Sequence, residues 1–141
     1  MAWPWMSGTR GADTTASGAA STRATIGRAG EALAQRYLEA RGLRVLERNY
    51  RVARGRSRRG GEIDLIALDG DGTVVFVEVR VRRGPMGGGA AASVSPAKQA
   101  RLVYAAQTWL AQGSRLPPCR FDVVAVDGDR VQWLKAAFEA E

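Results

Sequence analysis

Histidine is missing from the 141-residue chain. Its absence excludes Ser-His-Asp triads, Cys-His dyads and zinc sites built on imidazole ligands. Any catalysis must therefore use carboxylates, Lys or Arg side chains, hydroxyl groups, or a metal ion that oxygen ligands hold.

Cysteine and long apolar runs are almost as scarce. Cys119 is the only cysteine, which excludes an intrachain disulfide and a CxxC redox or metal pair. No run of about 18 apolar residues is present, so no membrane span is predicted, and the first residues lack the apolar segment of a signal peptide. We expect a cytoplasmic protein in which Cys119 is partly buried near the start of a strand.

Lysine is scarce among the cations. Lys98 and Lys135 are the only lysines among 21 basic residues, which leaves 19 arginines, and 14 acidic residues bring the net charge to +7. The guanidinium group pairs with phosphate through two hydrogen bonds, so a small Arg-rich basic domain favours nucleic acid as the partner. A high genomic GC content is an alternative explanation of the ratio of Arg to Lys.

Hydrophobic patterning predicts one domain after a tail. Residues 1–24 are rich in Gly, Ala, Ser and Thr without periodicity, which is typical of a disordered tail, and residues 25–141 are expected to form a single domain. The expected fold class is α/β, with a central mixed β-sheet flanked by helices in the order α-β-β-β-α-β-β, and with Trp109 and Trp133 in the core. Helices are expected at 27–42 and 96–112, the second capped by Ser95, and strands at 43–52, 62–68, 73–81, 121–126 and 131–134.

Two acidic residues stand out in the hairpin that strands 62–68 and 73–81 are expected to form. Alternate residues of a strand share a face, and the apolar residues of the two strands match only if odd positions pair with odd positions. This register places Asp64 opposite Glu78, with their Cβ atoms about 4.5–5.5 Å apart. The other face of the first strand is then expected to carry Ile63, Leu65 and Ala67.

Two carboxylates at that distance repel each other, so a positive charge has to offset them. Arg80, one same-face step beyond Glu78, is one candidate, as an ion-pair partner; a divalent cation such as Mg²⁺, bound by both carboxylates, is the other. On the first helix, Glu31 precedes Leu38 by two turns and therefore points along the buried edge, where an unpaired carboxylate is costly. The spacing alone leaves both explanations open.

Basic residues surround these acids in the sequence. The segment 53–61 is an Arg-rich loop, which either follows a nucleic-acid backbone or is a solvated run of charge. The candidate nucleic-acid-binding residues are Arg54, Arg56, Arg58, Arg59, Arg82, Arg83, Lys98 and Arg101.

Several segments resemble the YraN family of small bacterial proteins: GRAGEALAQRYLEARGLRVLERNYR, GGEIDLIALDGDGTVVFVEVRVRR, SPAKQARLVYAAQTWL and CRFDVVAV. That family is similar to the restriction-endonuclease-like PD-(D/E)xK nuclease superfamily, and in layout to Holliday junction resolvases. The resemblance covers about residues 26–126. It implies a restriction-endonuclease-like fold, a homodimer, and hydrolysis of DNA phosphodiesters, including those of branched or structured DNA.

The resemblance also assigns expected roles to residues. Asp64 and Glu78 match the ligands of Mg²⁺ or Mn²⁺, and Glu31 matches an acid of the first helix that supports the site. Gln99 matches a polar position of the second helix that faces the site. Glu62 belongs to the same Gly-Glu-Ile-Asp segment as Asp64, with a supporting or capping role.

Arg80 departs from the superfamily pattern, which has lysine two residues after Glu78. A lysine can orient water and lose its proton, whereas an arginine stays charged and can only neutralise negative charge on the phosphate. One hypothesis is therefore a metal-dependent nuclease in which Arg80 is the catalytic cation. A second is a non-catalytic nucleic-acid-binding module with a degenerate site. A third is a protein-interaction factor in which the acids and Arg80 form only a structural salt bridge.

Overall fold

The structure, a computed structural model, describes residues 22–53, 60–82 and 94–140. Within these ranges, two helices and five strands follow one another in the expected order α-β-β-β-α-β-β. They are α1 (Thr22–Ala40), β1 (Arg44–Val52), β2 (Gly61–Leu68), β3 (Val74–Arg82), α3 (Pro96–Leu110), β4 (Cys119–Asp127) and β5 (Arg130–Phe138). Residues 1–21, which make up most of the segment predicted as a disordered tail, lie outside the described residues, whereas residues 22–24 of that segment belong to α1, which begins five residues before the predicted start at 27.

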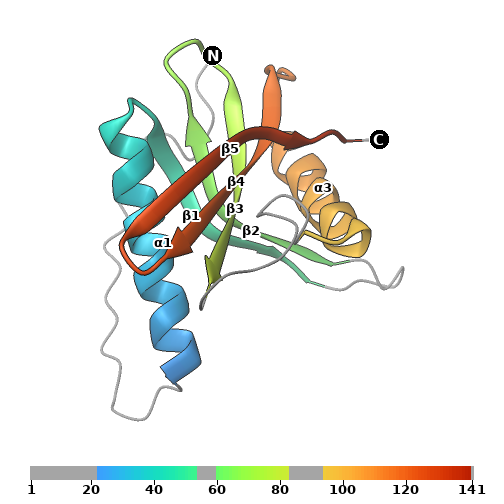
Figure 1. The fold of residues 1–141 in the computed structure, drawn as a ribbon. Helices are drawn as coiled ribbons and strands as arrows, with labels where there is room; N and C mark the ends of the chain where they lie inside the picture. Colours follow the sequence, from blue (N-terminus) through green and yellow to red (C-terminus); the bar gives the residue numbers. More distant parts are fainter. Residues whose placement is uncertain (1–21, 54–59, 83–93, 141) are drawn as a thin grey trace.

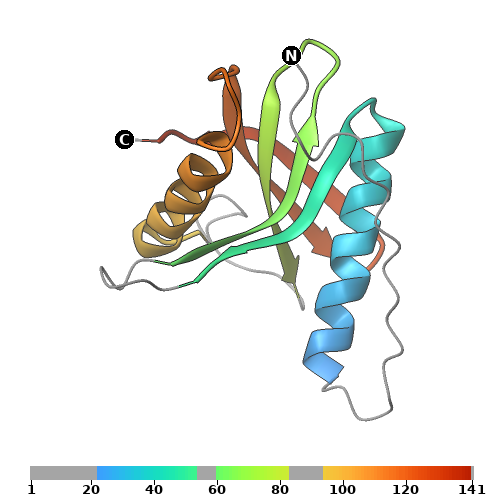
Figure 2. The same cartoon turned by 180° about the vertical axis from the view of Figure 1, so that it is seen from behind.

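A single mixed sheet forms the centre of the fold. Its strands lie in the order β1-β2-β3-β4-β5, and only the β3–β4 pair is parallel. The sheet stands between α1 and α3 in Figures 1 and 2. The predicted α/β class, with a mixed sheet flanked by helices as in a restriction-endonuclease-like fold, is confirmed.

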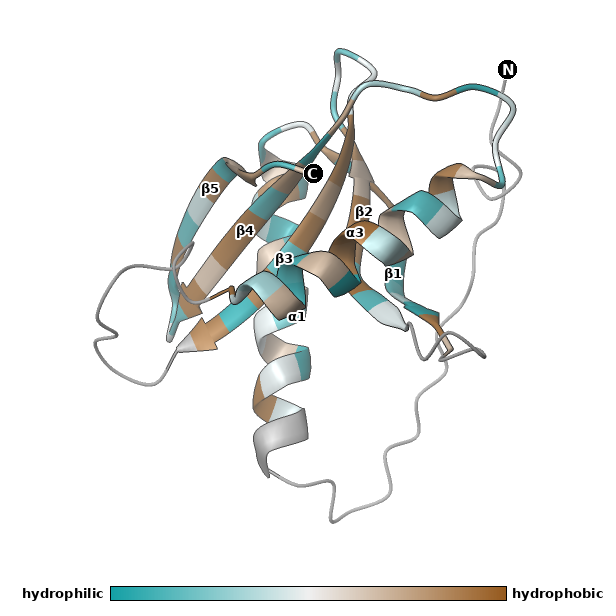
Figure 3. Ribbon diagram, turned by 90° about the vertical axis from the view of Figure 1, so that its right-hand side faces the viewer, coloured by the Kyte–Doolittle hydropathy of each residue, from teal (hydrophilic) through white to brown (hydrophobic). Residues whose placement is uncertain are grey.

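Each helix covers a different face of the sheet. Leu65 and Val77 belong to the buried cluster that includes Leu38 of α1, whereas their neighbours Ile66 and Phe76 belong to the cluster of α3. Successive residues of a strand point to opposite faces, so the two clusters lie on opposite sides of the sheet. The hydropathy colouring of Figure 3 shows the result, with brown concentrated along the central strands. Central strands that are buried on both faces read as almost continuous apolar runs.

Local signals explain where α3 begins and where α1 ends. Ser95 precedes Pro96, the first residue of α3, and its Oγ accepts a hydrogen bond from the Lys98 amide at 3.1 Å, as the predicted cap requires. Gly42, two residues after α1, has a φ of +94°, which glycine adopts without strain. Trp109, on the buried side of α3, is fully buried and meets Phe76 edge to face at 5.8 Å. Its predicted core position is confirmed.

The register of the β2–β3 hairpin follows the apolar pattern as predicted. Leu65 pairs with Val77 and Ala67 with Val75, so odd positions face odd positions. The prediction is wrong at one point, because the ladder ends at Leu65 and never reaches a pair between Asp64 and Glu78. Beyond this pair the two strands separate, and a hydrogen bond to a side chain replaces the backbone hydrogen bonds of the ladder. The Asp64 carboxylate accepts a hydrogen bond from the Val79 amide at 2.8 Å.

A second correction follows from the same break. Ile63 packs in the α3 cluster together with Ile66, and not with Leu65 and Ala67 as strict alternation predicted. Cys119 begins β4 as expected, but it is exposed and not partly buried. Ile63 still pairs with Tyr50 of β1, but Asn49, which would lie opposite Asp64, has a φ of +52° and forms no pair there, so the alternation is interrupted between Ile63 and Leu65.

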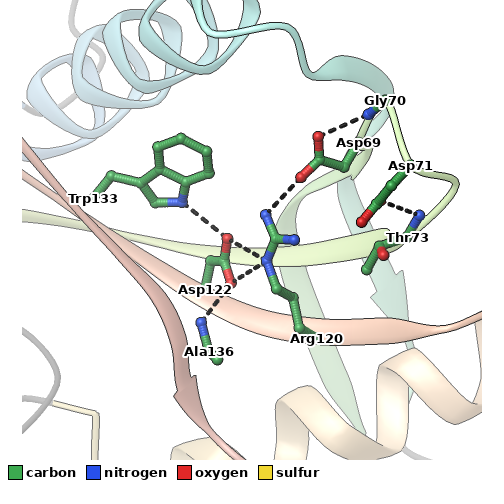
Figure 4. A network of polar contacts seen from close by, with 8 residues as sticks. All are labelled: Asp69, Gly70, Asp71, Thr73, Arg120, Asp122, Trp133 and Ala136. Carbon is green, nitrogen blue, oxygen red and sulfur yellow. Dashed lines mark hydrogen bonds and ion pairs between the residues drawn. The ribbon is translucent and has the colours of Figure 1, made fainter.

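A buried ion pair near the start of β4 connects this strand to the β2–β3 turn and to β5, as Figure 4 shows. The fully buried Asp122 accepts hydrogen bonds from Arg120, from the half-buried Trp133 and from the Ala136 amide. Arg120 also reaches Asp69, in the β2–β3 turn, at 3.1 Å. A buried carboxylate needs such partners, so this network serves the fold.

Within the three described ranges, no helix is both long and apolar enough to span a membrane.

Candidate functional site

At the break in the hairpin, one carboxylate interacts with two others. Asp64 comes from β2, Glu78 from β3 and Glu31 from α1. Asp64 is the carboxylate that they have in common: after burial, it is the next cause that raises the pKa of Glu31 and the pKa of Glu78. The helical and strand spacing had pointed to these same three residues.

The pKa shifts show that the cluster resists full ionisation. Burial, followed by the Asp64 charge, raises the pKa of Glu78 from 4.5 to about 8. Burial and then Asp64 also raise the pKa of Glu31, to about 7, and Glu62 adds to the effect. Near pH 7 the two glutamates therefore keep protons that solvent-exposed glutamates would have lost, because neighbouring carboxylates in a buried site cannot all be ionised.

Glu78 is a buried carboxylate whose hydrogen bonding is incomplete among the described residues. Its side chain is 3% exposed, and its Oε1 atom has no hydrogen-bond partner among the residues that the structure describes. The other oxygen, Oε2, faces Lys98 Nζ at 3.5 Å and Arg80 Nη1 at 3.8 Å. A buried carboxylate oxygen without a donor is costly unless it gains a proton or a cation. A proton shared with Asp64 is one remedy, and a metal ion is another.

The donor set suits a hard divalent cation. Mg²⁺ prefers oxygen ligands, and in sites that act on phosphates it takes one or two carboxylates and keeps several waters. Asp64 and Glu78 supply two such carboxylates. Among the described residues, no group of three or more Asp, Glu or Cys side chains is arranged to enclose an ion.

Two glycines let the helices approach the sheet beside the acids. A Cβ on Gly30, the neighbour of Glu31, would collide with the Val81 side chain of β3. A Cβ on Gly61, the first residue of β2, would collide with the backbone oxygen of Arg101 in α3. Glycine at these two positions therefore sets the distance from each helix to the strands that carry Asp64 and Glu78.

The remaining predicted site residues differ in whether they contact these acids. Arg80 is at the Glu78 carboxylate, with 35% of its side chain exposed. Gln99 is half-buried and donates to the Val94 carbonyl at 3.0 Å. Glu62 pairs with Arg51 at 3.2 Å, where both side chains are largely exposed. Arg101 is an exposed residue of α3.

Most of the predicted nucleic-acid-binding residues have no described side chain. Arg54, Arg56, Arg58, Arg59 and Arg83 lie outside the described residues, and Arg82 is described only through its backbone, as the last residue of β3.

Sequence reasoning missed one contact of the site. Lys98 was expected to face nucleic acid, and its contact with Glu78 was not foreseen. The signal was present, because Ser95 and Pro96 fix the start of α3 and place Lys98 in its first turn. Which strand that turn faces is a tertiary property.

A comparison with known families settles the relationship. The model of the "Uncharacterised protein family UPF0102" matches residues 30–126, which include Glu31, Asp64, Glu78 and Lys98. The chain belongs to the UPF0102 family. The earlier resemblance is thereby confirmed, since UPF0102 is the YraN family.

UPF0102 relatives match along most of their length. A UPF0102 protein of Methylibium petroleiphilum is 55% identical over 119 residues, which cover 84% of this chain and 98% of the relative. A UPF0102 protein of an Acidovorax species is 52% identical over 121 residues, covering 86% and 89%. A third, from Herminiimonas arsenicoxydans, is 49% identical over 120 residues, covering 85% and 91%.

Proposed function

We propose that this UPF0102 protein is a divalent-metal-dependent endonuclease that hydrolyses DNA phosphodiesters. The observation that carries the proposal is the orphaned Oε1 of Glu78, buried beside a second carboxylate, Asp64. An acid pair that only served the fold would have its oxygens satisfied, as those of Asp122 are. Buried groups with strongly shifted pKa values are enriched at functional sites.

Asp64 and Glu78 are the residues that would hold Mg²⁺ or Mn²⁺. When bound, such an ion supplies Lewis-acid chemistry, which polarises a phosphoryl oxygen and makes water a better nucleophile. The Val79 amide fixes the Asp64 carboxylate in place. Glu31, whose pKa burial and then Asp64 raise to about 7, would support Asp64 from α1.

Charge supports DNA as the substrate. The chain carries a net charge of +7, mostly through arginine, and phosphate contacts of Arg and Lys supply the sequence-independent part of nucleic-acid binding. Lys98 and Arg80 place positive charge directly at the acids, where a phosphodiester would have to enter. Branched or structured DNA as the preferred substrate, and a homodimer as the active form, rest on the resemblance to resolvases.

A cleavage screen tests this function. Four-way junctions, flaps and duplexes are incubated with Mg²⁺ or Mn²⁺ and the purified protein, beside Asp64→Asn and the exposed control Asp127→Asn. We expect Asp64→Asn to lose about 100-fold or more of the cleavage rate while still binding DNA, and Asp127→Asn to behave as wild type.

Two other outcomes would replace the proposal. DNA that stays intact under every condition, with salt-sensitive binding by a folded protein, favours the non-catalytic module in which Arg80 has replaced a reactive lysine. A protein that binds no nucleic acid at any salt concentration favours a role in protein assembly.

A further inference from the structure

Two cations face the same oxygen of Glu78, and they come from different elements. Lys98 Nζ, from α3, lies 3.5 Å from Oε2, and Arg80 Nη1, from β3, lies 3.8 Å from it. The distances are too similar to rank the two residues. Their anchoring and the chemistry of their head groups do separate them.

Arg80 shares its strand with Glu78, two residues further on, and is the more exposed of the two, at 35% of its side chain. Its guanidinium group has only this carboxylate as an ion-pair partner among the described residues. A half-exposed arginine that neutralises its same-face neighbour explains the contact fully, and needs no substrate.

Lys98 is anchored to the sheet from outside the hairpin. The Ser95 hydroxyl accepts from its backbone amide, and Pro96 fixes the first turn of α3. Gly61 allows the Arg101 carbonyl to press against β2 one turn further along the same helix. The backbone of Lys98 is thus held at a set distance from the acids, and its side chain is 25% exposed. Partial exposure leaves its ammonium group accessible from solvent.

The backbone at this end of α3 has little to offer an anion. Pro96 has no amide hydrogen, and the Lys98 amide is already bonded to Ser95. Two of the first three residues of α3 therefore offer no free amide, and Lys98 is the cationic side chain of its first turn.

We infer that Lys98 is the lysine of the site that faces the substrate: its ammonium group contacts a phosphate oxygen of the DNA, while Arg80 only neutralises Glu78. The inference rests on the proposed function. It assigns the role of the lysine that the superfamily pattern places on β3, where this chain has Arg80, to Lys98 of α3. An ammonium group has three donors on a compact charge, so it can keep the Glu78 contact and still donate to a phosphate.

Cleavage by four variants forms the first half of the test. We expect Lys98→Met to lose about 100-fold or more of the cleavage rate, and Lys98→Arg to recover part of it because the charge is kept. Arg80→Met is expected to lose less than about 10-fold. Lys135→Met, which removes the only other lysine, an exposed residue of β5, is the matched control and should cleave as wild type. Circular dichroism and urea unfolding establish that each variant is folded.

Lysine footprinting forms the second half and does not depend on activity. The protein is acetylated with and without a DNA duplex, in Ca²⁺ in place of Mg²⁺, and modification of its two lysines is measured by mass spectrometry. We expect DNA to slow acetylation of Lys98 by about fivefold or more and to leave Lys135 unchanged, because a phosphate contact shields the amine.

The outcomes separate the inference from the function on which it rests. A wild-type protein that cleaves no DNA overturns both. An active wild type with Lys98→Met still active and Arg80→Met inactive overturns only the inference. Loss of cleavage in Lys98→Met without protection of Lys98 by DNA also overturns it, because the lysine then acts through the structure of the site and not through the substrate.

Discussion

Replacing Asp64 by Asn should stabilise the metal-free protein at pH 8 while it abolishes cleavage. After burial, the charge of Asp64 is the next largest cause of the raised pKa values of Glu31 and Glu78. Asparagine keeps a carbonyl oxygen to accept the Val79 amide hydrogen, so the contact with β3 survives. The substitution therefore removes repulsion without removing the hydrogen bond that holds the break in the hairpin.

The size of the effect follows from the charge that is removed. Two unit charges about 5 Å apart interact by about 3 kcal/mol at an effective dielectric constant of 20. Because Glu78 has a pKa of about 8, it is only partly ionised at pH 8, so the gain should be about 1–2 kcal/mol. For a domain of this size that corresponds to a rise in Tm of roughly 3–8 °C.

The pH dependence makes the prediction specific. At pH 5 both glutamates are protonated and can donate a hydrogen bond to the Asp64 carboxylate, which a neutral asparagine accepts less strongly. The stabilisation should therefore vanish or change sign at pH 5. Thermal unfolding in EDTA at both pH values measures it, and the exposed Asp127→Asn should change neither Tm. An Asp64→Asn protein that is less stable at pH 8 would show that the acid cluster is a structural network, and would refute this reasoning.

Three further changes test other parts of the structure. In the absence of metal, the free energy of unfolding should fall as the pH rises from about 4.5 to 8, by roughly 3–5 kcal/mol for Glu78 alone, because the folded state holds a proton that the unfolded chain releases. Urea unfolding across this pH range measures the change. A free energy of unfolding that does not vary with pH would contradict the raised pKa values. Gly61→Ala should cost about 1–3 kcal/mol and reduce cleavage although every acid remains, because the new methyl group pushes α3 and Lys98 away from β2; wild-type Tm and rate would show that the close approach is unnecessary. Asp122→Ala should destabilise by about 3–5 kcal/mol in chemical denaturation, since it leaves Arg120 without its buried partner, whereas the cleavage rate per folded molecule should persist.

Much of this fold was predictable because local signals agreed with one another. The hydrophobic pattern of the β2–β3 hairpin fixed its register, since a slip by one residue would turn every apolar side chain to the wrong face. Ser95 and Pro96 marked the start of α3, and Gly42 the end of α1. The helical repeat also placed Glu31 along a buried edge, where the structure has it.

Other features depend on contacts between distant segments. Alternation predicted a ladder pair between Asp64 and Glu78, but the strands separate one step earlier. Nothing local to β2 indicates that a carboxylate will take a backbone amide of β3 in place of the ladder. The partners of Asp122, from the β2–β3 turn to β5, are equally remote in sequence.

The sequence by itself determined the residue types available for chemistry, the order of the elements and the two acids at the hairpin, because composition and periodicity are properties of the local chain. Only the tertiary structure decided that Asp64 raises the pKa values of both Glu31 and Glu78, and that Lys98 of α3 contacts Glu78 of β3. Burial and the distance between charges set those energies, and both arise only when α1 and α3 close on opposite faces of the sheet.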